Sequence, residues 1–331
     1  MNCSNNTVIV LHDEVLKHAQ KDELDTLEEV HAVSKVLSGL GFNTIQVPFS
    51  PDVKKVIHKL KEINPIFVFN LVESVLGEGS LCFLAPYIFD YLNIKYTGCP
   101  TEAMILTTNK ITTKKLLKQY GINTPEWVSI DEDNGFIPNR KYIIKATNED
   151  ASIGLAQDSI IFASTYNDIT KKLTEKTEKM GKDFFAERFI DGREFNVSIL
   201  GSSEFPNVLE PVEMKFFGFE ENNKEKIICY RAKWEEGTFE YDNIRRVSDF
   251  GSEDTFLINK LKNISELCWN KFKLKGYARV DFRVDEYGEI WVLEINTNPC
   301  ITPAGSSFVS ASTQAGLSYD QVIEKIITAV S

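Results

Sequence analysis

The chain has 331 residues, 43% hydrophobic and 26% charged, a composition typical of a globular protein with room for two or three domains. Asp and Glu outnumber Lys and Arg by 48 to 37, and the net charge of -11 disfavours binding to a nucleic-acid backbone. No apolar run reaches the roughly 20 residues that span a bilayer, and the first six residues have neither the basic nor the apolar region of a signal peptide. We therefore expect a cytoplasmic protein whose partners include neither nucleic acid nor membrane.

The cysteines are scattered along the chain, without a Cys-x-x-Cys pair and without a histidine at ligand spacing. This spacing predicts neither a zinc site nor a disulfide framework. Because there are only four histidines, carboxylates and lysines are the expected catalytic groups. The six cysteines are Cys3, Cys82, Cys99, Cys229, Cys268 and Cys300.

Strand and helix signals alternate over the first hundred residues, a pattern typical of a small parallel α/β domain. Runs rich in β-branched residues predict strands at 7–11, 44–47, 66–71 and 94–96. Helical spacing of apolar residues predicts a helix that is capped at Asp25 or Thr26 and ends at Gly41, with further helices near 52–63 and 83–92. The first domain is expected to span residues 1–105.

The next segment, residues 106–183, is predicted to be an α+β module. A basic helix over 109–120 ends at Gly121, and Pro125 prevents its continuation. Strands are expected at 127–128, 142–145 and 159–162, with a loop at 146–154 and a helix over 166–180.

Strands dominate residues 184–331, the third predicted module. They are expected at 184–189, 194–200, 207–214 and 227–233, before a long helix near 253–272 and a hairpin over 277–296. Ser318-x-x-Gln321 is a capping box that begins a last helix ending near Val330.

The hairpin carries the strongest functional signal. Alternation of side chains places Arg279, Asp281 and Arg283 on one face of its first strand. A four-residue turn at 285–288 would pair residue 279 with residue 294 and residue 281 with residue 292. In the second strand the alternation predicts one face with Val292, Glu294 and Asn296 and an opposite face with Trp291, Leu293 and Ile295.

Arg279, Asp281, Glu294 and Asn296 would then share one face. An arginine, two carboxylates and an amide together form a site of hard oxygen ligands that suits Mg²⁺. The ordinary alternative is a solvated polar face with an ion pair across the strands.

Seven motifs in chain order resemble the ATP-grasp superfamily and, within it, the D-alanine–D-alanine ligases. The resemblance covers almost the whole chain and implies an α/β and α+β fold, in which an N-terminal parallel α/β domain precedes two α+β modules that hold the nucleotide between them. The domains implied are 1–105, 106–183 and 184–331. The motifs are Tyr96-Thr97-Gly98, Asn109-Lys110, Gly121 to Pro125, Ile143-Ile144-Lys145, Glu187 to Glu194, Arg279-x-Asp281 and Leu293 to Pro299.

The resemblance implies an ATP site. Lys110 and Lys145 would reach the phosphates, and the γ-phosphate would also meet Lys233. Glu187 would accept from the adenine amino group, and Glu194 would bind the ribose hydroxyls. The other nucleotide-binding residues implied are Arg188, Phe189 and Ile190 at the edge of the adenine ring, and Ser152 and Gly154 in the phosphate-covering loop 147–154.

The same resemblance implies that the hairpin is part of a catalytic centre. Asp281, Glu294 and Asn296 become ligands of Mg²⁺, with Mn²⁺ as an alternative ion. Arg279 would steady the transferred phosphoryl group and the tetrahedral intermediate. The remaining members of the implied catalytic set are Lys233, Ser152 and the backbone N–H of Cys300.

Departures from the family pattern cluster at the substrate end. The acidic motif that follows the first strand is missing, although acids between residues 13 and 29 are candidates to replace it. Ala151 stands where the family has a serine, Trp234 where it has a tyrosine, and Cys300 where it has a glycine. These departures predict a substrate other than D-alanine.

The activity implied is ATP-dependent ligation of a carboxylate, from an amino acid or peptide, to an amine through an acylphosphate, with release of ADP and phosphate. Two alternatives stay open: a true D-alanine–D-alanine ligase of cell-wall synthesis, and a non-catalytic ATP-binding regulatory protein. The complete metal-ligand set favours catalysis. The family also implies a homodimer formed through the N-terminal domain.

Overall fold

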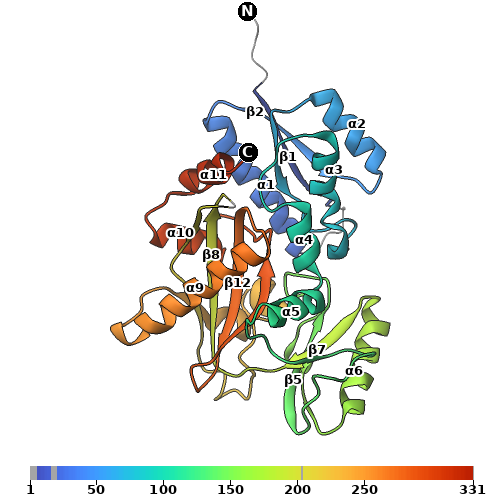
Figure 1. Cartoon of the computed structure of the whole chain (residues 1–331), viewed down its shortest axis with the longest axis vertical. Helices are drawn as coiled ribbons and strands as arrows, with labels where there is room; N and C mark the ends of the chain where they lie inside the picture. Colours follow the sequence, from blue (N-terminus) through green and yellow to red (C-terminus); the bar gives the residue numbers. More distant parts are fainter. Residues whose placement is uncertain (1–5, 16–20, 203, 331) are drawn as a thin grey trace, which may run out of the picture.

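The computed structural model describes residues 6–15, 21–202 and 204–330, which form three β-sheets surrounded by helices (Figure 1). Cys3 lies outside the described residues. The N-terminal sheet lies at one end of the molecule in this view, and the other two sheets lie side by side at the opposite end. Three short 3₁₀ helices, Gly79–Leu81, Gln157–Ser159 and Ser252–Asp254, join larger elements.

The N-terminal sheet is parallel and has the strand order β2-β1-β3. Alternate side chains of its central strand enter two separate cores: Val8 and Val10 pack toward α1, and Ile9 and Leu11 pack toward α2 and α3. Both faces of the sheet are therefore covered, as a parallel sheet requires. The elements are β1 (Thr7–Asp13), α1 (Lys21–Gly39), β2 (Asn43–Phe49), α2 (Val53–Ile63), β3 (Phe67–Leu71) and α3 (Leu84–Leu92).

Two details of this domain were predicted wrongly. Helix α1 begins at Lys21, so Asp25 and Thr26 lie within the helix and do not cap it. The strand predicted at 94–96 is reduced to one parallel bridge between Val68 and Tyr96, because the left-handed C-cap at Asn93 leaves few residues before the turn at Gly98.

The central sheet is antiparallel with the order β4-β7-β5-β6, and α6 packs on it through Ile169 and Leu173. Its last strand in the chain, β7, begins at Phe184, so the predicted boundary after residue 183 separates β7 from the sheet to which it belongs. The elements are β4 (Trp127–Val128), β5 (Arg140–Ala146), β6 (Ile160–Ala163), α6 (Tyr166–Met180) and β7 (Phe184–Arg188).

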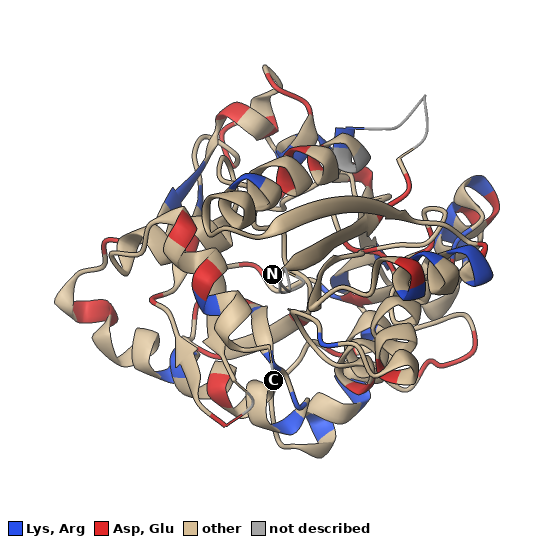
Figure 2. Cartoon of the chain, turned by 90° about the horizontal axis from the view of Figure 1, so that it is seen from above, with Lys and Arg blue, Asp and Glu red and all other residues tan. Residues whose placement is uncertain are grey.

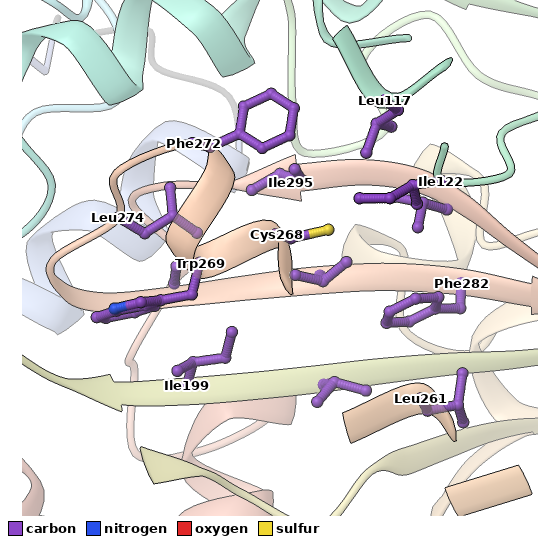
Figure 3. Packing of buried hydrophobic residues seen from close by; sticks show 14 of the residues in the cluster. Leu117, Ile122, Ile199, Leu261, Cys268, Trp269, Phe272, Leu274, Phe282 and Ile295 are labelled. Carbon is purple, nitrogen blue, oxygen red and sulfur yellow. The ribbon is translucent and has the colours of Figure 1, made fainter. Parts of the chain in front are cut away.

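The C-terminal sheet has the order β11-β10-β8-β12-β13, and β9 pairs with β8. Helix α9 covers one face, where Leu261, Cys268 and Trp269 meet Phe282 of β12 (Figure 3). The strands are β8 (Arg193–Gly201), β9 (Pro206–Val208), β10 (Val212–Phe216), β11 (Ile244–Val247), β12 (Gly276–Val284) and β13 (Ile290–Asn296). The helices beside this sheet are α7 (Tyr230–Trp234), α8 (Phe239–Asp242), α9 (Thr255–Lys271), α10 (Ser307–Gln314) and α11 (Tyr319–Thr328).

The helices that precede the central sheet in the chain belong to the C-terminal core. Met104 of α4 (Thr101–Thr108) and Leu117 of α5 (Lys110–Gln119) are buried with Ile295 of β13 in the core shown in Figure 3. Helix α5 therefore joins the central sheet to the C-terminal sheet. The predicted basic helix at 109–120 is confirmed, and so is the capping box at Ser318 that begins α11.

The N-terminal domain is bound tightly to the C-terminal sheet. Tyr277, at the start of β12, is fully buried and its hydroxyl donates to Asn298 Oδ1 at 2.6 Å. Asn298 in turn donates to the carbonyl of Val72 at 3.1 Å. A Cβ at Gly276 would lie 2.9 Å from the backbone of Gly98, so glycine is required where these two segments cross. The domain interface thus reaches the end of strand β13.

Two predictions for the third module were wrong. Residues 227–233 do not form a strand: Ile227 and Cys229 are buried against Ile143, and α7 follows them. The hairpin turn is longer than predicted, because the Asp285 side chain accepts from the N–H groups of Tyr287 and Glu289 at 3.0 Å and closes a loop over 285–289.

A β-bulge in the hairpin changes the predicted register and faces. Asp281 pairs with Glu294, but Phe282 pairs with Val292, so Leu293 is an extra residue on β13. The bulge moves Val292 into the core and Trp291 to the opposite face, which reverses the prediction for both.

Charged residues of both signs alternate along the outer helices, and neither sign covers a whole face in the view of Figure 2. Among the helices that the structure describes, none combines the length and apolarity needed to cross a membrane.

Candidate active site

A cavity of about 880 Å³ opens between the central and C-terminal sheets and extends to the N-terminal domain. With one exception, every residue that the sequence assigned to the site lines this cavity. The exception is Gly154, which lines a neighbouring cavity of about 920 Å³ on the other side of loop 147–154. The residues confirmed to lie together are Lys110, Lys145, Ser152, Glu187, Arg188, Phe189, Ile190, Glu194, Lys233, Arg279, Asp281, Glu294, Asn296 and Cys300.

The polar face of the β12–β13 hairpin forms one wall of the cavity. Arg279 donates from Nε and one terminal nitrogen to the two oxygens of Asp281, at 2.7 and 2.8 Å, along the same strand. Asn196 of β8, which sequence reasoning missed, donates to Asp281 Oδ1 at 2.7 Å. Glu294 faces Asp281 across the strands. The bulge at Leu293 therefore leaves the predicted polar cluster intact.

The donor set suits a cation that is shared with a ligand. Asp281, Glu294 and Asn296 supply two carboxylates and one amide, and Mg²⁺ takes few protein ligands of this kind and completes its shell with phosphates and water. In the described parts of the chain, no group of three or more His, Cys, Asp and Glu side chains is placed to hold a metal alone. The set thus fits Mg²⁺ bound together with a nucleotide, and does not resemble a closed structural site.

Lysines surround Glu294. Lys110 lies 3.5 Å from Glu294 Oε2 and also contacts Asp150 at 2.9 Å. Although burial opposes ionisation, Lys110 and Lys145 hold the pKa of Glu294 well below its usual range. Lys233 lines the same cavity, and no described carboxylate lies within 4 Å of its ammonium group. Glu294 therefore stays negatively charged at any physiological pH.

Glu187 is the most deeply buried acid of the cavity, with only 1% of its surface exposed. Lys145 contacts its Oε1 at 2.6 Å, and Lys114 lies 2.5 Å from Oε2. The Oε2 atom is buried and is in contact with Lys114, although no hydrogen bond of regular geometry is formed there. Lys114 was missed, although it lies one helical turn after Lys110 and therefore on the same face of α5.

Glu194 is held by Arg283, another residue that sequence reasoning left without a role. The contact is 2.5 Å, and Arg283 also donates to the carbonyls of Ile190 and Gly192 at 3.4 Å. Arg283 thus fixes the turn between β7 and β8. The N–H of Phe189 donates to the backbone carbonyl of Lys141 at 2.9 Å, which leaves the Phe189 carbonyl and ring for a nucleotide.

The loop 147–154 is tied to the segment before and within α7. The Ser152 hydroxyl donates to the carbonyl of Ile228 at 2.7 Å, and Trp234 Nε1 donates to the carbonyl of Ala151 at 3.1 Å. Ala151 and Ser152 both have positive φ angles, of 53° and 60°, which costs about 1–3 kcal/mol for each such residue. The indole of Trp234 therefore helps to hold this loop in place.

The N-terminal domain contributes Asp25, Glu28, Glu29 and Glu73 to the cavity, together with Lys21, and the carboxyl groups of Asp25, Glu29 and Glu73 interact with one another. Glu29 accepts from the N–H of Ile301 at 2.6 Å, and Cys300 Sγ lies 3.2 Å from Asp25 Oδ2. No described Lys or Arg lies within 4 Å of any of these three carboxylates. Burial and mutual repulsion raise the pKa of Glu29 to about 8 and the pKa of Glu73 well above its usual value.

The acids between residues 13 and 29 therefore have different positions. Asp25 and Glu29 reach the cavity, whereas Asp13 accepts from the N–H of Glu73 at 2.9 Å and supports that loop. The side chains of Asp22 and Glu23 lie outside the described residues. Glu73 gave no signal in the sequence, because only the fold brings the end of β3 next to α1.

Comparison with known proteins identifies the family. The family model for the D-ala D-ala ligase C-terminus matches residues 116–328. The chain belongs to this family. It is 29% identical over 308 residues to a D-alanine–D-alanine ligase from Aquifex aeolicus, with 92% of this chain and 94% of the relative covered. A D-alanine–D-alanine ligase from Carboxydothermus hydrogenoformans is also 29% identical over 308 residues, with 89% and 90% covered.

Solved structures share the fold. The D-alanine–D-alanine ligase from Bacillus anthracis complexed with ATP superimposes with a TM-score of 0.73 at 18% identity, over 98% of this chain and 96% of that chain. The VanG D-Ala:D-Ser ligase from Enterococcus faecalis superimposes with a TM-score of 0.69 at 17% identity, over 98% and 99% of the two chains.

The protein is therefore an ATP-grasp enzyme that joins a carboxylate to an amine and forms ADP. Its cofactors are ATP and Mg²⁺, and its substrates are small molecules. The predicted fold class and activity are confirmed, and the alternative of a non-catalytic regulator is set aside.

Replacement of Glu294 by Gln should lower donor-dependent ADP formation about 10²-fold or more, because it removes a charge from the oxygen-donor face where phosphoryl transfer is stabilised. The measurement is ADP release as a function of Mg²⁺ concentration, with E289Q on the same hairpin as a matched control. A wild-type rate in E294Q would show that Glu294 holds no metal.

Replacement of Glu187 by Ala should weaken ATP binding more than GTP binding, because Glu187 offers an acceptor to an exocyclic amino group that guanine does not present there. The selectivity lost should be about 1–3 kcal/mol, measured by calorimetry with both nucleotides. E132A, which removes an exposed acid, is the control, and melting temperatures verify that E187A is folded. Equal losses for ATP and GTP would make Glu187 a purely structural residue.

Proposed function

We propose that this ligase activates the carboxylate of an amino acid or short peptide and transfers it to an amine, and that D-alanine is a poor substrate. The observation that carries the proposal is the composition of one cavity. It combines an oxygen-donor face for a metal nucleotide with three carboxylates that no described cation neutralises. A substrate ammonium group would favour the ionised form of these carboxyl groups and pair with them.

The nucleotide occupies the side of the cavity formed by the central sheet. Glu187 accepts from the adenine amino group and Glu194, held by Arg283, accepts from the ribose hydroxyls. Lys110, Lys145 and Lys233 contact the phosphates. The other predicted contacts follow: Arg188, Phe189 and Ile190 at the ring edge, and Ser152 and Gly154 as parts of the loop that covers the phosphates.

Asp281, Glu294 and Asn296 would hold Mg²⁺, which when bound neutralises phosphate charge. In the first step a carboxylate oxygen of the substrate attacks the γ-phosphorus, the bond to the β-phosphate oxygen breaks, and ADP leaves. Lys233 and Arg279 stabilise the charge on the transferred group. Because Arg279 already lies against Asp281, its guanidinium is oriented before substrate binds.

In the second step the amine attacks the carbonyl of the acylphosphate. Arg279 and the N–H of Cys300 stabilise the oxyanion, phosphate leaves, and the amine nitrogen gives up a proton as the amide forms. The N–H of Ile301 does not take part, because it donates to Glu29. The catalytic set that we propose is therefore Arg279, Lys233, Ser152 and Cys300, with Ser152 acting through the position of its loop.

The three acids of the N-terminal domain take the place of the missing acidic motif. Asp25, Glu29 and Glu73 would bind the ammonium group of the first substrate. They lie next to Cys300, whose backbone N–H is proposed to stabilise the oxyanion. Ala151 and Trp234, which contact each other, offer no hydroxyl for the same purpose. A true D-alanine–D-alanine ligase is the second candidate, favoured by 29% identity over nearly the whole chain to enzymes of that name.

We also propose three domains, at 1–105, 106–183 and 184–331, with β7 crossing the second boundary to complete the central sheet, and a homodimer formed through the N-terminal domain. Tyr87 and Tyr91 on α3, which are 57% and 70% exposed, support such an interface. A cytoplasmic location without nucleic-acid or membrane partners is supported by the net charge of -11 and by the cysteines of the described residues, all of which are free thiols.

Steady-state kinetics on a panel of amino acids and dipeptides tests the substrate. With D-alanine alone, kcat/KM should be about 10³-fold below that of the best substrate, since each lost polar contact costs roughly 1–3 kcal/mol. Product analysis by mass spectrometry identifies the amide. If D-alanine matches every other substrate and D-alanyl-D-alanine is formed, the enzyme is a plain D-alanine–D-alanine ligase.

The pH dependence tests the acidic subsite. Because the pKa of Glu29 is raised to about 8, this residue is neutral below that pH and negative above it. Affinity for a substrate ammonium group should therefore rise with pH, and kcat/KM should increase up to tenfold per pH unit between pH 6.5 and 8. E29Q should have a flatter profile over this range. An identical slope in wild type and E29Q would remove Glu29 from substrate binding.

A further inference from the structure

Helix α6, which lies beside β5 and β7 in Figure 1, carries a buried lysine that the mechanism above does not use. This residue, Lys176, is only 9% exposed. Two other described lysines, Lys110 and Lys114, are equally buried, and they contact the carboxylates of Asp150 and Glu187 at 2.9 and 2.5 Å. By contrast, no carboxylate of the described residues lies within 4 Å of the Lys176 ammonium group. Its burial therefore needs another explanation than an ion pair.

The partners of Lys176 belong to the end of the phosphate-covering loop 147–154 and to the turn that follows it. The ammonium group donates to the carbonyl of Gly154 at 2.6 Å and to the hydroxyl of Ser159 at 2.7 Å. Burial lowers the pKa of Lys176, because the charged form is poorly solvated there. A buried cation is unfavourable unless hydrogen bonds compensate for the lost water, so these two contacts fix the Gly154 carbonyl firmly.

Gly154 itself has little freedom to move. Its φ angle is 71°, and a Cβ at this position would lie 2.9 Å from Met180 Sδ and 3.0 Å from the ring of Phe184. The end of the loop therefore packs closely on the end of α6 and the start of β7, with its carbonyl directed at Lys176.

The peptide group between Gly154 and Leu155 is held at both ends. Its carbonyl accepts from Lys176, and its N–H, which belongs to Leu155, donates to the carbonyl of Ser152 at 3.0 Å. Because a peptide group is planar, these two contacts together determine its orientation. Lys176 thus controls, through one peptide group, how Ser152 is presented to the nucleotide.

Lys176 reaches the loop from the side that faces away from the nucleotide. Asp150 and Ile153 of the loop line both the cavity of about 880 Å³ and the neighbouring one of about 920 Å³, so the loop separates the two. Ser152 lines the first of these cavities, whereas Gly154 and Lys176 line the second. Any effect of Lys176 on a nucleotide in the first cavity must therefore act through the loop.

We infer that Lys176 is a positioning residue for the phosphate-covering loop: it contacts no nucleotide and holds the Gly154–Leu155 peptide so that the loop is in place before ATP binds. This inference rests on the proposed function, in which the loop covers the phosphates. It assigns the support of that loop to α6, on the side of the central sheet that faces away from the active cavity.

The test compares binding of ATP and of adenosine by calorimetry in the presence of Mg²⁺. K176M removes both hydrogen bonds and keeps an unbranched side chain of similar length beside Phe184. Its Kd for ATP should rise about tenfold, the effect of losing a hydrogen bond from a charged group. Its Kd for adenosine should change less than about twofold, because adenosine has no phosphates for the loop to cover. K176R, which keeps charged donors, should fall between wild type and K176M.

Hydrogen exchange reads the position of the loop without any ligand. The Leu155 N–H should exchange faster in K176M than in wild type, because the peptide group loses the contact at its other end. K179M is the matched control, since Lys179 is an exposed lysine of the same helix that lines the same second cavity. This variant should behave as wild type in both experiments, and melting temperatures establish that all three variants are folded.

Four outcomes would overturn the inference. An unchanged Kd for ATP in K176M means that the loop does not need Lys176. Equal losses for ATP and adenosine mean that Lys176 supports the central sheet as a whole. An equal loss in K179M means that the positive charge of the second cavity matters and the contact with Gly154 does not. If wild type binds ATP no more tightly than adenosine, the proposed phosphate contacts fail first, and this inference fails with them.

Discussion

The bulge at Leu293 is the constraint on which the active cavity depends. Without an extra residue on β13, regular alternation could not place Val292 in the core and also turn Glu294 toward Asp281 in this register. Core packing fixes the strand, and the bulge rotates its last residues toward the cavity. The metal-binding face is thus a local irregularity that a well-packed sheet holds in place, with Phe282 and Ile295 buried directly behind it.

Charge is distributed over the cavity by domain. Most basic groups of the cavity come from the central and C-terminal modules, whereas the N-terminal domain adds the acids Asp25, Glu29 and Glu73, with Lys21 as its one basic group among the described lining residues. Such a division requires the domains to keep a fixed relation, because a small displacement would separate the two halves of the site. The buried contact of Tyr277 with Asn298, and of Asn298 with Val72, provides this rigidity. Folding of the N-terminal domain against β12 is therefore part of building the substrate site.

Sequence reasoning predicted what depends on local pattern. The parallel N-terminal domain follows from alternating strand and helix signals, and the polar face at Asp281 follows from strand periodicity. Contacts between distant segments could not be predicted this way. Asn196 reaches Asp281 only because β8 lies beside β12, and Glu73 meets Glu29 only because the fold brings β3 next to α1. Lys114 could have been predicted, since helical spacing already places it beside Lys110. The sequence of a basic helix does not show, however, which of its lysines is buried.

The thiol at the centre of the acid cluster has a consequence for the chemistry of the enzyme. Cys300 opens onto a reactive cavity, yet burial and the neighbouring acids Glu29 and Asp25 raise its pKa well above the usual value. Because the thiolate is the form that reacts with oxidants and alkylating agents, we expect this cysteine to react slowly with them at neutral pH. The same buried acidic surroundings that would bind an ammonium group therefore disfavour the thiolate of Cys300.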